Sequence, residues 1–279
     1  MSPSRVLPSD SLMLTIHPNV EHRAADYDLD CETLRGLWRM EERHFWFDVR
    51  NRWIQQALDC YGLRPPARFL EVGCGSGAVA GALQRHGFSV VGIDTATVLV
   101  EKAHERFPTI AFVSGHIDQL SPDLGPFDGV GLFDVLEHLD DPVSLLRSAL
   151  MHAAPGALVV ATVPALRSHF SVVDEIAGHK RRYQPGELKA TFIDAGLLEV
   201  SEHGIFRVLR PLLRARRAAL VAPTDPAQRR LIMLNDFRIP PFPLNDLLRL
   251  LCVLEARIGF GSSRDKAGPT LLAAGRKPA

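Results

Sequence analysis

Short apolar runs alternate with helical patterns between residues 68 and 163, and this alternation restricts the fold more than any other feature. Each run has the length of one strand, and most segments between the runs are long enough for a short helix. A strand, a helix and a further strand in succession are typical of a parallel sheet with helices on both faces. Because such crossovers are right-handed, the pattern predicts a doubly wound α/β sheet. The strands are predicted at 68–72, 89–93, 110–113, 127–133 and 157–163.

The predicted helices between these strands span 77–85, 98–106 and 142–153. Beyond Pro164 the alternation is less regular, with a helix predicted at 185–195, a sixth strand at 198–206 and a last strand at 270–274. We divide the chain into a flexible arm (1–25), a helical N-terminal cap (26–64), a ligand-binding core (65–206), a helical insert or lid (207–268), and a final strand with a tail (269–279).

The charge balance and the cysteines exclude several classes of protein. Lysine and arginine number 32, as do aspartate and glutamate, so no overall charge favours nucleic acid. The four cysteines form no CxxC pair and have no histidine at zinc-finger spacing, which favours reduced thiols without a metal. No apolar run approaches the roughly 18 residues that span a bilayer. We expect a cytoplasmic monomer or homodimer without a signal peptide.

A glycine-rich turn follows the first predicted strand, in residues 70–77, LEVGCGSG. Glycine lets the backbone turn sharply and lets a ligand lie directly against it. The spacing is GxGxG and differs from the GxGxxG of dinucleotide-binding proteins. Glu71 precedes the first glycine by two residues and would repel a pyrophosphate, so the turn favours a cationic ligand.

Asp94 ends the second predicted strand, within the sequence GID at residues 92–94. A carboxylate at the tip of this strand can accept hydrogen bonds from both hydroxyls of a ribose. The turn and Asp94 together therefore favour a ligand with a ribose and a positive charge. S-adenosylmethionine (SAM), an adenosine joined to a methionine sulfonium, meets both conditions and is the predicted cofactor.

Four motifs in order give the chain a family resemblance: residues 71–77, residues 92–94, Phe127-Asp128, and the segment DVLEHLDDP at 134–142. On these motifs the chain resembles the class I SAM-dependent methyltransferases. The last segment is similar to that of the branch with the ubiquinone-pathway O-methyltransferases. The resemblance implies a Rossmann-like, doubly wound, mostly parallel seven-stranded sheet whose final strand, at 269–275, is antiparallel.

The resemblance also implies roles for residues of the turn and of the neighbouring strand end. The residues implied to shape the methionine pocket are Glu71, Gly73, Gly75 and Gly77. Cys74, inside the same turn, is expected to be a small filler beside the cofactor and not a nucleophile. Asp94 is expected to hold the ribose, the alternative being a helix cap, and Thr95 to lie beside the adenine.

Further cofactor contacts are implied beyond the other strands. His116 stands where the family often has an acid near the adenine, so we expect Ile117 to stack on the adenine instead. Asp134 and Val135, after the fourth strand, are expected to face the methyl donor. Arg50, from the predicted N-terminal helix, is expected to pair with the methionine carboxylate.

The flank at 178–188, GHKRRYQPGEL, is similar to a segment common in bacterial methyltransferases of glycan or lipid pathways. It follows the fifth strand, on the substrate side of an open α/β sheet. We expect His179 or Tyr183 to contact the acceptor and the cations at 180–182 to attract an anionic group, unless this is a solvated basic run. His179 and His138 are the candidate general bases, and His138 alternatively begins a helix against the core.

The sequence therefore predicts a SAM-dependent methyltransferase that acts on a small molecule or on a glycan or lipid intermediate, with oxygen as the favoured acceptor atom. A nicotinamide-dinucleotide oxidoreductase and a non-catalytic SAM-binding protein are the alternatives. For the insert at 207–268 four roles stay open: a packed subdomain, a lid, a dimer face, or peripheral contact of its apolar helices and arginines with a membrane.

Overall fold

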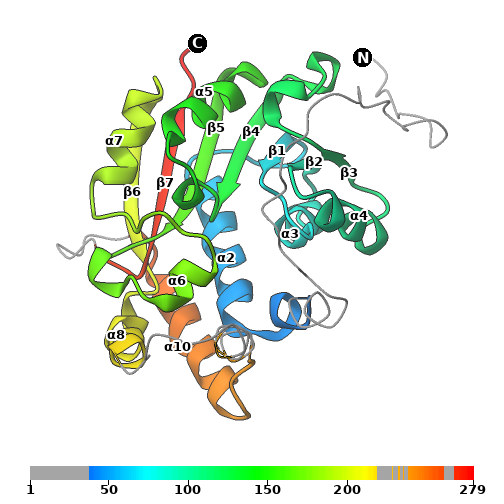
Figure 1. Cartoon of the computed structure of the whole chain (residues 1–279). Coiled ribbons are helices and arrows are strands. Elements are labelled where there is room, and N and C mark those ends of the chain that lie inside the picture. Colours follow the sequence, from blue (N-terminus) through cyan, green and yellow to red (C-terminus); the bar gives the residue numbers. More distant parts are fainter. Residues whose placement is uncertain (1–37, 219–227, 229–231, 233–234, 236–237, 261–266) are drawn as a thin grey trace.

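The computed structural model describes residues 38–218, 228, 232, 235, 238–260 and 267–279. Within them the chain forms one seven-stranded sheet that is flanked by helices (Figure 1). The predicted flexible arm at 1–25 and the first part of the predicted N-terminal cap lie outside the described residues.

The strand order in the sheet is β3-β2-β1-β4-β5-β7-β6. Strands β1 to β5 are parallel, whereas β7 runs antiparallel to both of its neighbours, β5 and β6. This arrangement confirms the predicted seven-stranded, mostly parallel, Rossmann-like sheet with an antiparallel last strand. The strands are β1 (Arg68–Val72), β2 (Ser89–Asp94), β3 (Ala111–Ser114), β4 (Phe127–Phe133), β5 (Ala153–Pro164), β6 (Leu198–Ile205) and β7 (Thr270–Arg276).

The direction of winding reverses between β1 and β4. From β1 the chain moves outward to β3, and it then returns to place β4 on the other side of β1. Ligands of open α/β sheets bind at such a reversal, beyond the carboxyl ends of the strands. The glycine-rich turn after β1 and the residues after β4 therefore flank the expected ligand crevice.

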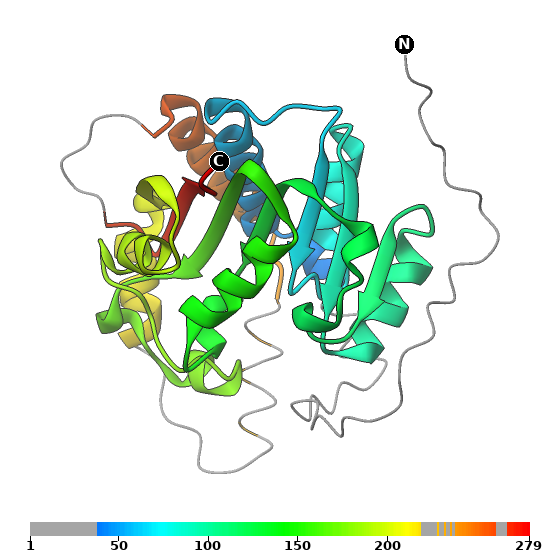
Figure 2. The ribbon, with the colours of Figure 1, turned by 90° about the horizontal axis from the view of Figure 1, so that it is seen from above.

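Helices cover both faces of the sheet, as Figure 2 shows from above. Buried side chains of α2, α3, α4 and α10 form the core on one face, and those of α5 and α7 form the core on the other. The helices are α2 (Phe45–Cys60), α3 (Ala78–Arg85), α4 (Thr97–Arg106), α5 (Pro142–Met151), α6 (Val172–Ile176), α7 (Glu187–Asp194), α8 (Arg210–Ala218) and α10 (Leu244–Ile258). Short 3-10 turns lie at Ile117–Gln119, Pro122–Leu124, Leu136–His138, Arg167–His169 and Arg207–Leu209.

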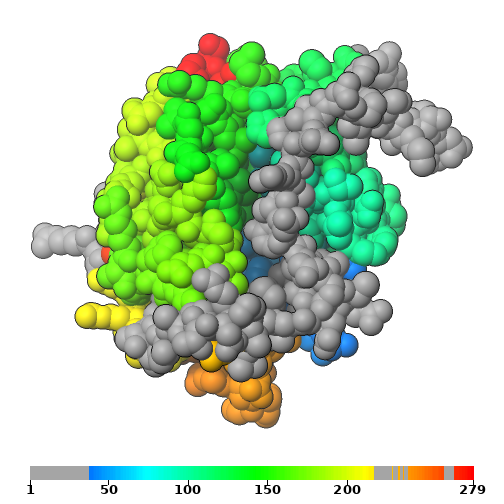
Figure 3. Space-filling view, in the orientation of Figure 1, coloured from blue at the N-terminus to red at the C-terminus, as the bar shows by residue number. Residues whose placement is uncertain are grey.

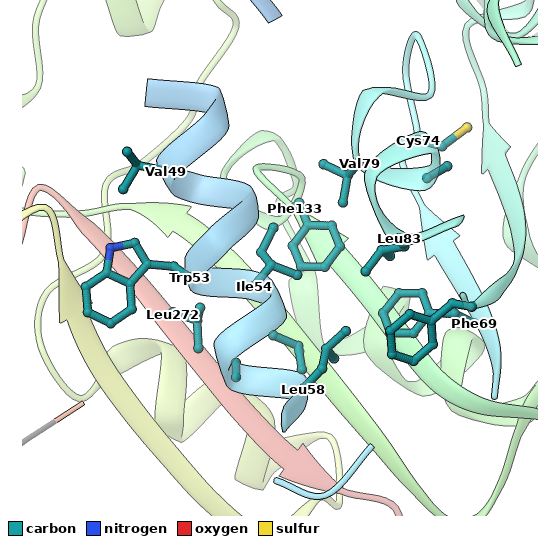
Figure 4. Close-up of a cluster of buried hydrophobic side chains, with 14 of the residues drawn as sticks. Val49, Trp53, Ile54, Leu58, Phe69, Cys74, Val79, Leu83, Phe133 and Leu272 are labelled. Carbon is teal, nitrogen blue, oxygen red and sulfur yellow. The ribbon is translucent and has the colours of Figure 1, made fainter. Parts of the chain in front are cut away.

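Helix α2 packs directly over the centre of the sheet. Figure 4 shows Ile54 and Leu58 of this helix over the strands that carry Phe69, Phe133 and Leu272. Ile54 and Leu58 are four residues apart and therefore lie on one face of the helix, where they are buried together. The N-terminal end of α2 thereby stays beside the carboxyl ends of the central strands.

Part of the predicted insert is integrated into the core. Leu248, Cys252 and Ala256 of α10 join the same buried cluster as α2. Asn245 also accepts a hydrogen bond from the Phe45 backbone N–H at 3.1 Å and donates one to the Arg43 carbonyl at 3.1 Å. None of the helices in the described part of the chain is long and apolar enough to cross a bilayer.

Among the predicted element boundaries that were wrong, two reflect backbone geometry that periodicity does not report. Strand β5 begins at Ala153 and not at residue 157, because Ala153 already pairs with Phe127 of β4. Helix α7 begins at Glu187 and not at residue 185, because Gly186 has a φ of +95°, outside the helical region. Within the predicted helical insert, α10 spans Leu244–Ile258.

Candidate functional site

The glycine-rich turn has the backbone that its sequence predicts. Gly73, Gly75 and Gly77 have φ values of +75°, +50° and +76°, in the left-handed region that glycine favours. A Cβ on Gly73 would lie 2.4 Å from Val135, and one on Gly77 would lie 2.7 Å from Phe112. A Cβ on Gly75 would meet no atom within 4 Å. The space above Gly75 is therefore open to a ligand that lies against the backbone.

Asp94 connects the tip of β2 to this turn. Its Oδ2 accepts a hydrogen bond from the Gly75 N–H at 2.8 Å, and its Oδ1 accepts one from the Ala96 N–H at 2.8 Å. The carboxylate therefore lies beside the glycine-rich turn and stabilises it. Thr95 is exposed directly beside it.

Cys74 points away from the open side of the turn. Its side chain is buried in the core cluster that Figure 4 shows, together with Phe112 and Val79. Burial, with the nearby carboxylates Glu71 and Asp94, raises the pKa of this thiol well above its ordinary value. The thiol is therefore a buried filler of the turn.

Glu71 is a buried acid beneath the same turn, with 2% of its surface exposed. Its Oε2 has no hydrogen-bond partner among the described residues. Desolvation raises the pKa of Glu71 to about 8, against the opposing effect of the Arg50 guanidinium. An unpaired buried carboxylate favours a cation, so Glu71 fits the ammonium of a methionine group bound at this turn.

Arg50 and Asp134 form an ion pair at the same crevice. Arg50 Nη1 donates to Asp134 Oδ2 at 2.6 Å, and the Thr162 hydroxyl donates to Asp134 Oδ1 at 3.2 Å. Arg50 is buried in α2, and its Nε has no hydrogen-bond partner among the described residues. The guanidinium thus keeps a free donor, which suits the carboxylate of a bound methionine group.

The segment after β3 differs from the sequence prediction. Ile117 is 2% exposed and belongs to the buried cluster of the α5 face. It has almost no free surface on which an adenine ring can stack. His116 is exposed instead and lies 2.9 Å from the Asp118 carboxylate. The backbone near this position still reaches the site, because the Gly115 N–H donates to the Asp94 carbonyl at 2.9 Å.

A second carboxylate–histidine contact lies in the segment that follows β5. His179 Nδ1 is 3.0 Å from Asp174 Oδ1, and Asp174 is fully buried at the first turn of α6. The same carboxylate oxygen accepts a hydrogen bond from Arg182 Nε at 2.7 Å. When Asp174 accepts the Nδ1 proton, Nε2 of His179 becomes the proton-accepting nitrogen.

A cavity of about 300 Å³ lies beside this dyad. It is bounded by side chains from the first turn of α2 and the residues before it, from the tip of β4, from α6 and from α8. Its lining includes Met40, Trp46, Phe47, Asp134, Glu137, Asp174, His179, Leu213 and Arg216. The cavity therefore joins an apolar, aromatic wall to the polar groups that surround Asp134 and His179.

A larger hollow of about 600 Å³ lies on the outer side of α2, against α3 and α10. It is lined by polar side chains such as Arg52, Gln55 and Arg257, and by none of the predicted site residues. Its position away from the strand ends makes the smaller cavity the better candidate for an acceptor site.

His138 and Glu137 lie beside His179. The rings of His138 and His179 have centroids 4.8 Å apart, and burial lowers the pKa of His138. Glu137 is fully buried, neither of its carboxyl oxygens has a hydrogen-bond partner in the described chain, and burial raises its pKa well above the ordinary value. Ligand atoms of these three residues lie within 4.8 Å of one another, a spacing that a metal ion can bridge. His138 does not line the 300 Å³ cavity, whereas His179 does.

Tyr183 and the neighbouring basic residues do not have the predicted positions. Tyr183 is 3% exposed, its hydroxyl donates to the Leu136 carbonyl at 3.3 Å, and burial raises its pKa to about 12. Lys180 pairs with Asp140, and Arg181 donates to the Leu139 carbonyl at 2.8 Å. These contacts connect the segment to the loop after β4, while the side chain of Lys180 stays exposed.

Sequence reasoning missed two acids that complete the site. Glu41, in the short helical stretch before α2, accepts hydrogen bonds from Ser76 Oγ at 2.7 and 2.6 Å and lies 2.5 Å from Arg106 Nη1. Asp174 was missed in the same way. Neither acid lies in a recognisable motif, and each meets its partner only through tertiary structure.

Comparison with known proteins agrees with this geometry. A model of the family described as a methyltransferase domain matches residues 38–203, more than half of the chain. The ubiquinone biosynthesis O-methyltransferase of Coxiella burnetii is 29% identical over 140 residues, which cover 49% of this chain and 58% of the relative. The demethylmenaquinone methyltransferase of Beutenbergia cavernae is 34% identical over 108 residues, which cover 39% and 45%. The chain thus spans about half the length of these curated relatives.

Solved structures share the fold at low identity. A chain from the complex of the Haloferax volcanii Trm112 methyltransferase activator with its methyltransferase is 20% identical, with a TM-score of 0.54 and coverage of 87% of this chain and 94% of that one. The plantazolicin methyltransferase BamL is 15% identical, with a TM-score of 0.52 and coverage of 89% and 91%. The [4+2]-cyclase SpnF is also similar, at 18% identity, a TM-score of 0.52 and 84% coverage of both chains.

Proposed function

Because the chain belongs to the methyltransferase-domain family, we propose that it transfers the methyl group of SAM to a small molecule or to a glycan or lipid intermediate. Oxygen is the proposed acceptor atom. Two observations support this choice: the relative from Coxiella burnetii is named an O-methyltransferase, and a buried carboxylate orients His179 at the acceptor cavity. The His179 contact carries the proposal, because a hydroxyl acceptor needs a base.

The residues around the glycine-rich turn fit SAM. Gly75 leaves open space against the backbone, and Asp94 lies at the strand tip where a ribose is bound in such sheets. Glu71 and Arg50 each have a buried polar atom without a partner among the described residues, and these suit the ammonium and the carboxylate of the methionine group. When bound, SAM supplies a methyl group that its sulfonium makes electrophilic.

His179 is the proposed general base. Asp174 accepts the Nδ1 proton of His179 and thereby leaves Nε2 to take a proton from an acceptor hydroxyl in the cavity. Arg182 neutralises the buried Asp174 carboxylate and holds it in place. The base therefore keeps one orientation, and the hydroxyl becomes a stronger nucleophile as its proton leaves.

The cavity wall indicates the kind of acceptor. Met40, Trp46 and Phe47 supply an apolar and aromatic surface, and Trp46 is held by stacking on Phe206 at 4.0 Å between ring centroids. Such a wall favours a flat or apolar acceptor that presents its hydroxyl to His179. A hydroxylated aromatic compound is the acceptor class that fits both parts of the cavity.

Calorimetry with SAM and S-adenosylhomocysteine tests the cofactor first. We expect wild type to bind in the micromolar range and Asp94→Ala to bind at least tenfold more weakly, about 1.4 kcal/mol. Asp123→Ala, which removes an exposed acid away from the site, serves as the matched control and should bind as wild type. Absence of binding by folded wild type would contradict the proposal.

A transfer assay separates the alternatives. Methyl transfer from labelled SAM to hydroxylated aromatic compounds supports the proposal, whereas SAM binding without turnover on any acceptor indicates a non-catalytic binding protein. The likeness to the [4+2]-cyclase SpnF shows that this fold also occurs in a protein of another reaction class. Tight binding of NAD without SAM binding would favour the oxidoreductase, which the GxGxG turn disfavours.

A further inference from the structure

A stripe of large apolar side chains is exposed along one side of α10. Leu247 and Leu250 are 52% and 55% exposed, and Ile258 is 77% exposed. The members of the α10 stripe recur at three- and four-residue steps, so they share one side of the helix. The stripe consists of Leu244, Leu247, Leu250, Leu251, Leu254 and Ile258.

The α10 stripe is separate from the side of the helix that packs on the core. Leu248, Cys252 and Ala256 face α2 and are buried, so α10 has two apolar sides, of which α2 covers one and the described residues leave the other exposed. Phe242, just before the helix, is 86% exposed and extends the apolar surface. In Figure 3 the α10 region is the orange surface at the lower edge of the molecule. Contiguous exposed apolar surface of this kind marks an interaction site.

The segment that carries the stripe is strongly basic. Residues 207–268 contain 12 lysines and arginines and 5 aspartates and glutamates, which gives this segment a net charge of +7. Since the whole chain has 32 residues of each sign, the rest of the protein has a net charge of −7. The sequence therefore concentrates positive charge in the segment that exposes the apolar side chains.

The segment that carries the stripe also exposes arginines in the structure. Arg257 follows Leu254 by three residues and Leu250 by seven, which places it at the border of the stripe. Arg214 on α8 and Arg238 before α10 are also exposed. In the part of the chain that the structure describes, no ion pair involves the side chains of these three arginines.

We propose that the α10 stripe, with Phe242 and the exposed arginines of the same segment, is a docking surface for an anionic lipid membrane. Leucine and phenylalanine side chains enter the boundary between head groups and acyl chains, while arginines remain at the anionic head groups. A second copy of this chain fits less well, because a homodimer through this surface would bring two segments of net charge +7 together.

The position of α10 gives the docking surface a role in bringing the acceptor to the cavity, and this role rests on the proposed function. Asn245, in the first turn of α10, bonds the backbone of Arg43 and Phe45, and the adjacent Trp46 and Phe47 line the acceptor cavity. The docking surface therefore begins beside the cavity. An amphiphilic acceptor that resides in the membrane can then reach His179 from the bound surface.

Co-sedimentation of the full chain with vesicles tests the proposal. Vesicles of phosphatidylcholine mixed with phosphatidylglycerol are compared with vesicles of phosphatidylcholine alone. We expect binding to the anionic vesicles that is at least about tenfold tighter than to the neutral ones and that weakens in high salt. Leu250→Glu combined with Leu254→Glu should weaken binding by at least about tenfold, because two inserted apolar groups become charged.

Met151→Glu is the matched control, because Met151 is 81% exposed on α5 and lies outside the docking surface. It should bind anionic vesicles as wild type does, and Arg257→Gln should reduce the preference for anionic over neutral vesicles. Circular dichroism of each variant reports that it is folded, and SAM calorimetry is measured separately. Failure of SAM binding by wild type would contradict the proposed function alone, since vesicle binding does not depend on it.

Three results would overturn the proposal. The first is wild-type protein that stays in solution with anionic vesicles. The second is a Leu250→Glu/Leu254→Glu variant that binds them as tightly as wild type. The third is a wild-type dimer, detected by light scattering and dissociated by the same two substitutions, that binds no vesicles; the α10 stripe would then be an interface between copies of this chain.

Discussion

Arg50 of α2 and Asp134 at the tip of β4 are 84 residues apart in sequence, and Arg50 Nη1 donates to Asp134 Oδ2 at 2.6 Å. This pair connects the N-terminal helix to the centre of the sheet, at the border between the glycine-rich turn and the acceptor cavity. Asp134 also has a φ of +58°, a conformation that aspartate and asparagine tolerate better than most residues. The ion pair therefore fixes both the backbone conformation at Asp134 and the position of the two charges in the site.

Arg50→Gln should reduce both stability and SAM affinity. The substitution leaves the partly buried Asp134 carboxylate without its cation, which we expect to cost about 1–3 kcal/mol of unfolding free energy, since Asp134 is one-third exposed. SAM affinity should fall by about tenfold, measured by calorimetry. Arg52→Gln breaks the exposed pair with Asp48 and should cost about 0.5 kcal/mol without affecting SAM. Equal effects of the two substitutions would refute a special role for Arg50.

Gly75→Ala should weaken SAM binding more than its backbone strain explains. Gly75 and Gly62 have φ values of +50° and +78°, and a Cβ on either would meet no protein atom within 4 Å. Both alanine variants should therefore lose about 1 kcal/mol of stability in urea unfolding. Only Gly75→Ala should lose SAM affinity, by about tenfold or more, because its methyl group occupies the space against the turn. Similar SAM affinities for both variants would place the ligand elsewhere.

Glu71 should make stability depend on pH. Because the pKa of Glu71 is about 8 in the folded protein and 4.5 in the unfolded chain, the folded state retains a proton that the unfolded chain releases. This contribution is complete below pH 4.5 and is lost as pH rises through about 8. Urea unfolding of wild type should therefore show a falling midpoint over this range relative to Glu71→Gln. Parallel pH profiles for the two proteins would mean that Glu71 is ionised in the folded state.

SAM binding should release a proton from Glu71. An ammonium bound near this carboxylate favours its ionised form, so binding in the window just below about pH 8, where Glu71 is protonated, displaces the proton. Calorimetry in buffers of different ionisation enthalpy measures this release, and SAM affinity should rise with pH across the window. Glu71→Gln should bind SAM without that proton. Proton uptake by wild type on binding would have the wrong sign and would contradict the contact.

His179→Gln should reduce kcat without reducing SAM affinity. Loss of a general base lowers rates by about 10²–10⁴-fold. Tyr183→Phe should leave kcat unchanged and cost about 1 kcal/mol of stability, because its hydroxyl donates to a backbone carbonyl in the core. Asp174→Asn should resemble His179→Gln in kcat while also destabilising the fold, since Arg182 loses its partner. A His179→Gln enzyme of normal kcat would make His138 the next candidate.

The fold was largely predictable because burial of strands and helices in a sheet fold requires a periodic pattern of apolar residues in the sequence. Alternating runs located the strands, and the glycines of the turn predicted the positive φ values of Gly73, Gly75 and Gly77. The topology of the sheet also brings Asp94 to Gly75. Carboxyl ends of neighbouring parallel strands meet at one edge, so residues that follow β1 and β2 must come together.

The partners of individual polar side chains could not be predicted in this way. Periodicity reports which side of an element is buried, but it does not report which residue of another element lies opposite. Asp174 meets His179 only because α6 folds back toward the segment that carries His179. Ile117 and Tyr183 are buried because neighbouring helices cover them. The sequence by itself thus determined the sheet, the glycine-rich turn and the acid beside it. Only the tertiary structure decided which charges neutralise one another and which histidine faces the cavity, because those contacts join segments that no local pattern relates.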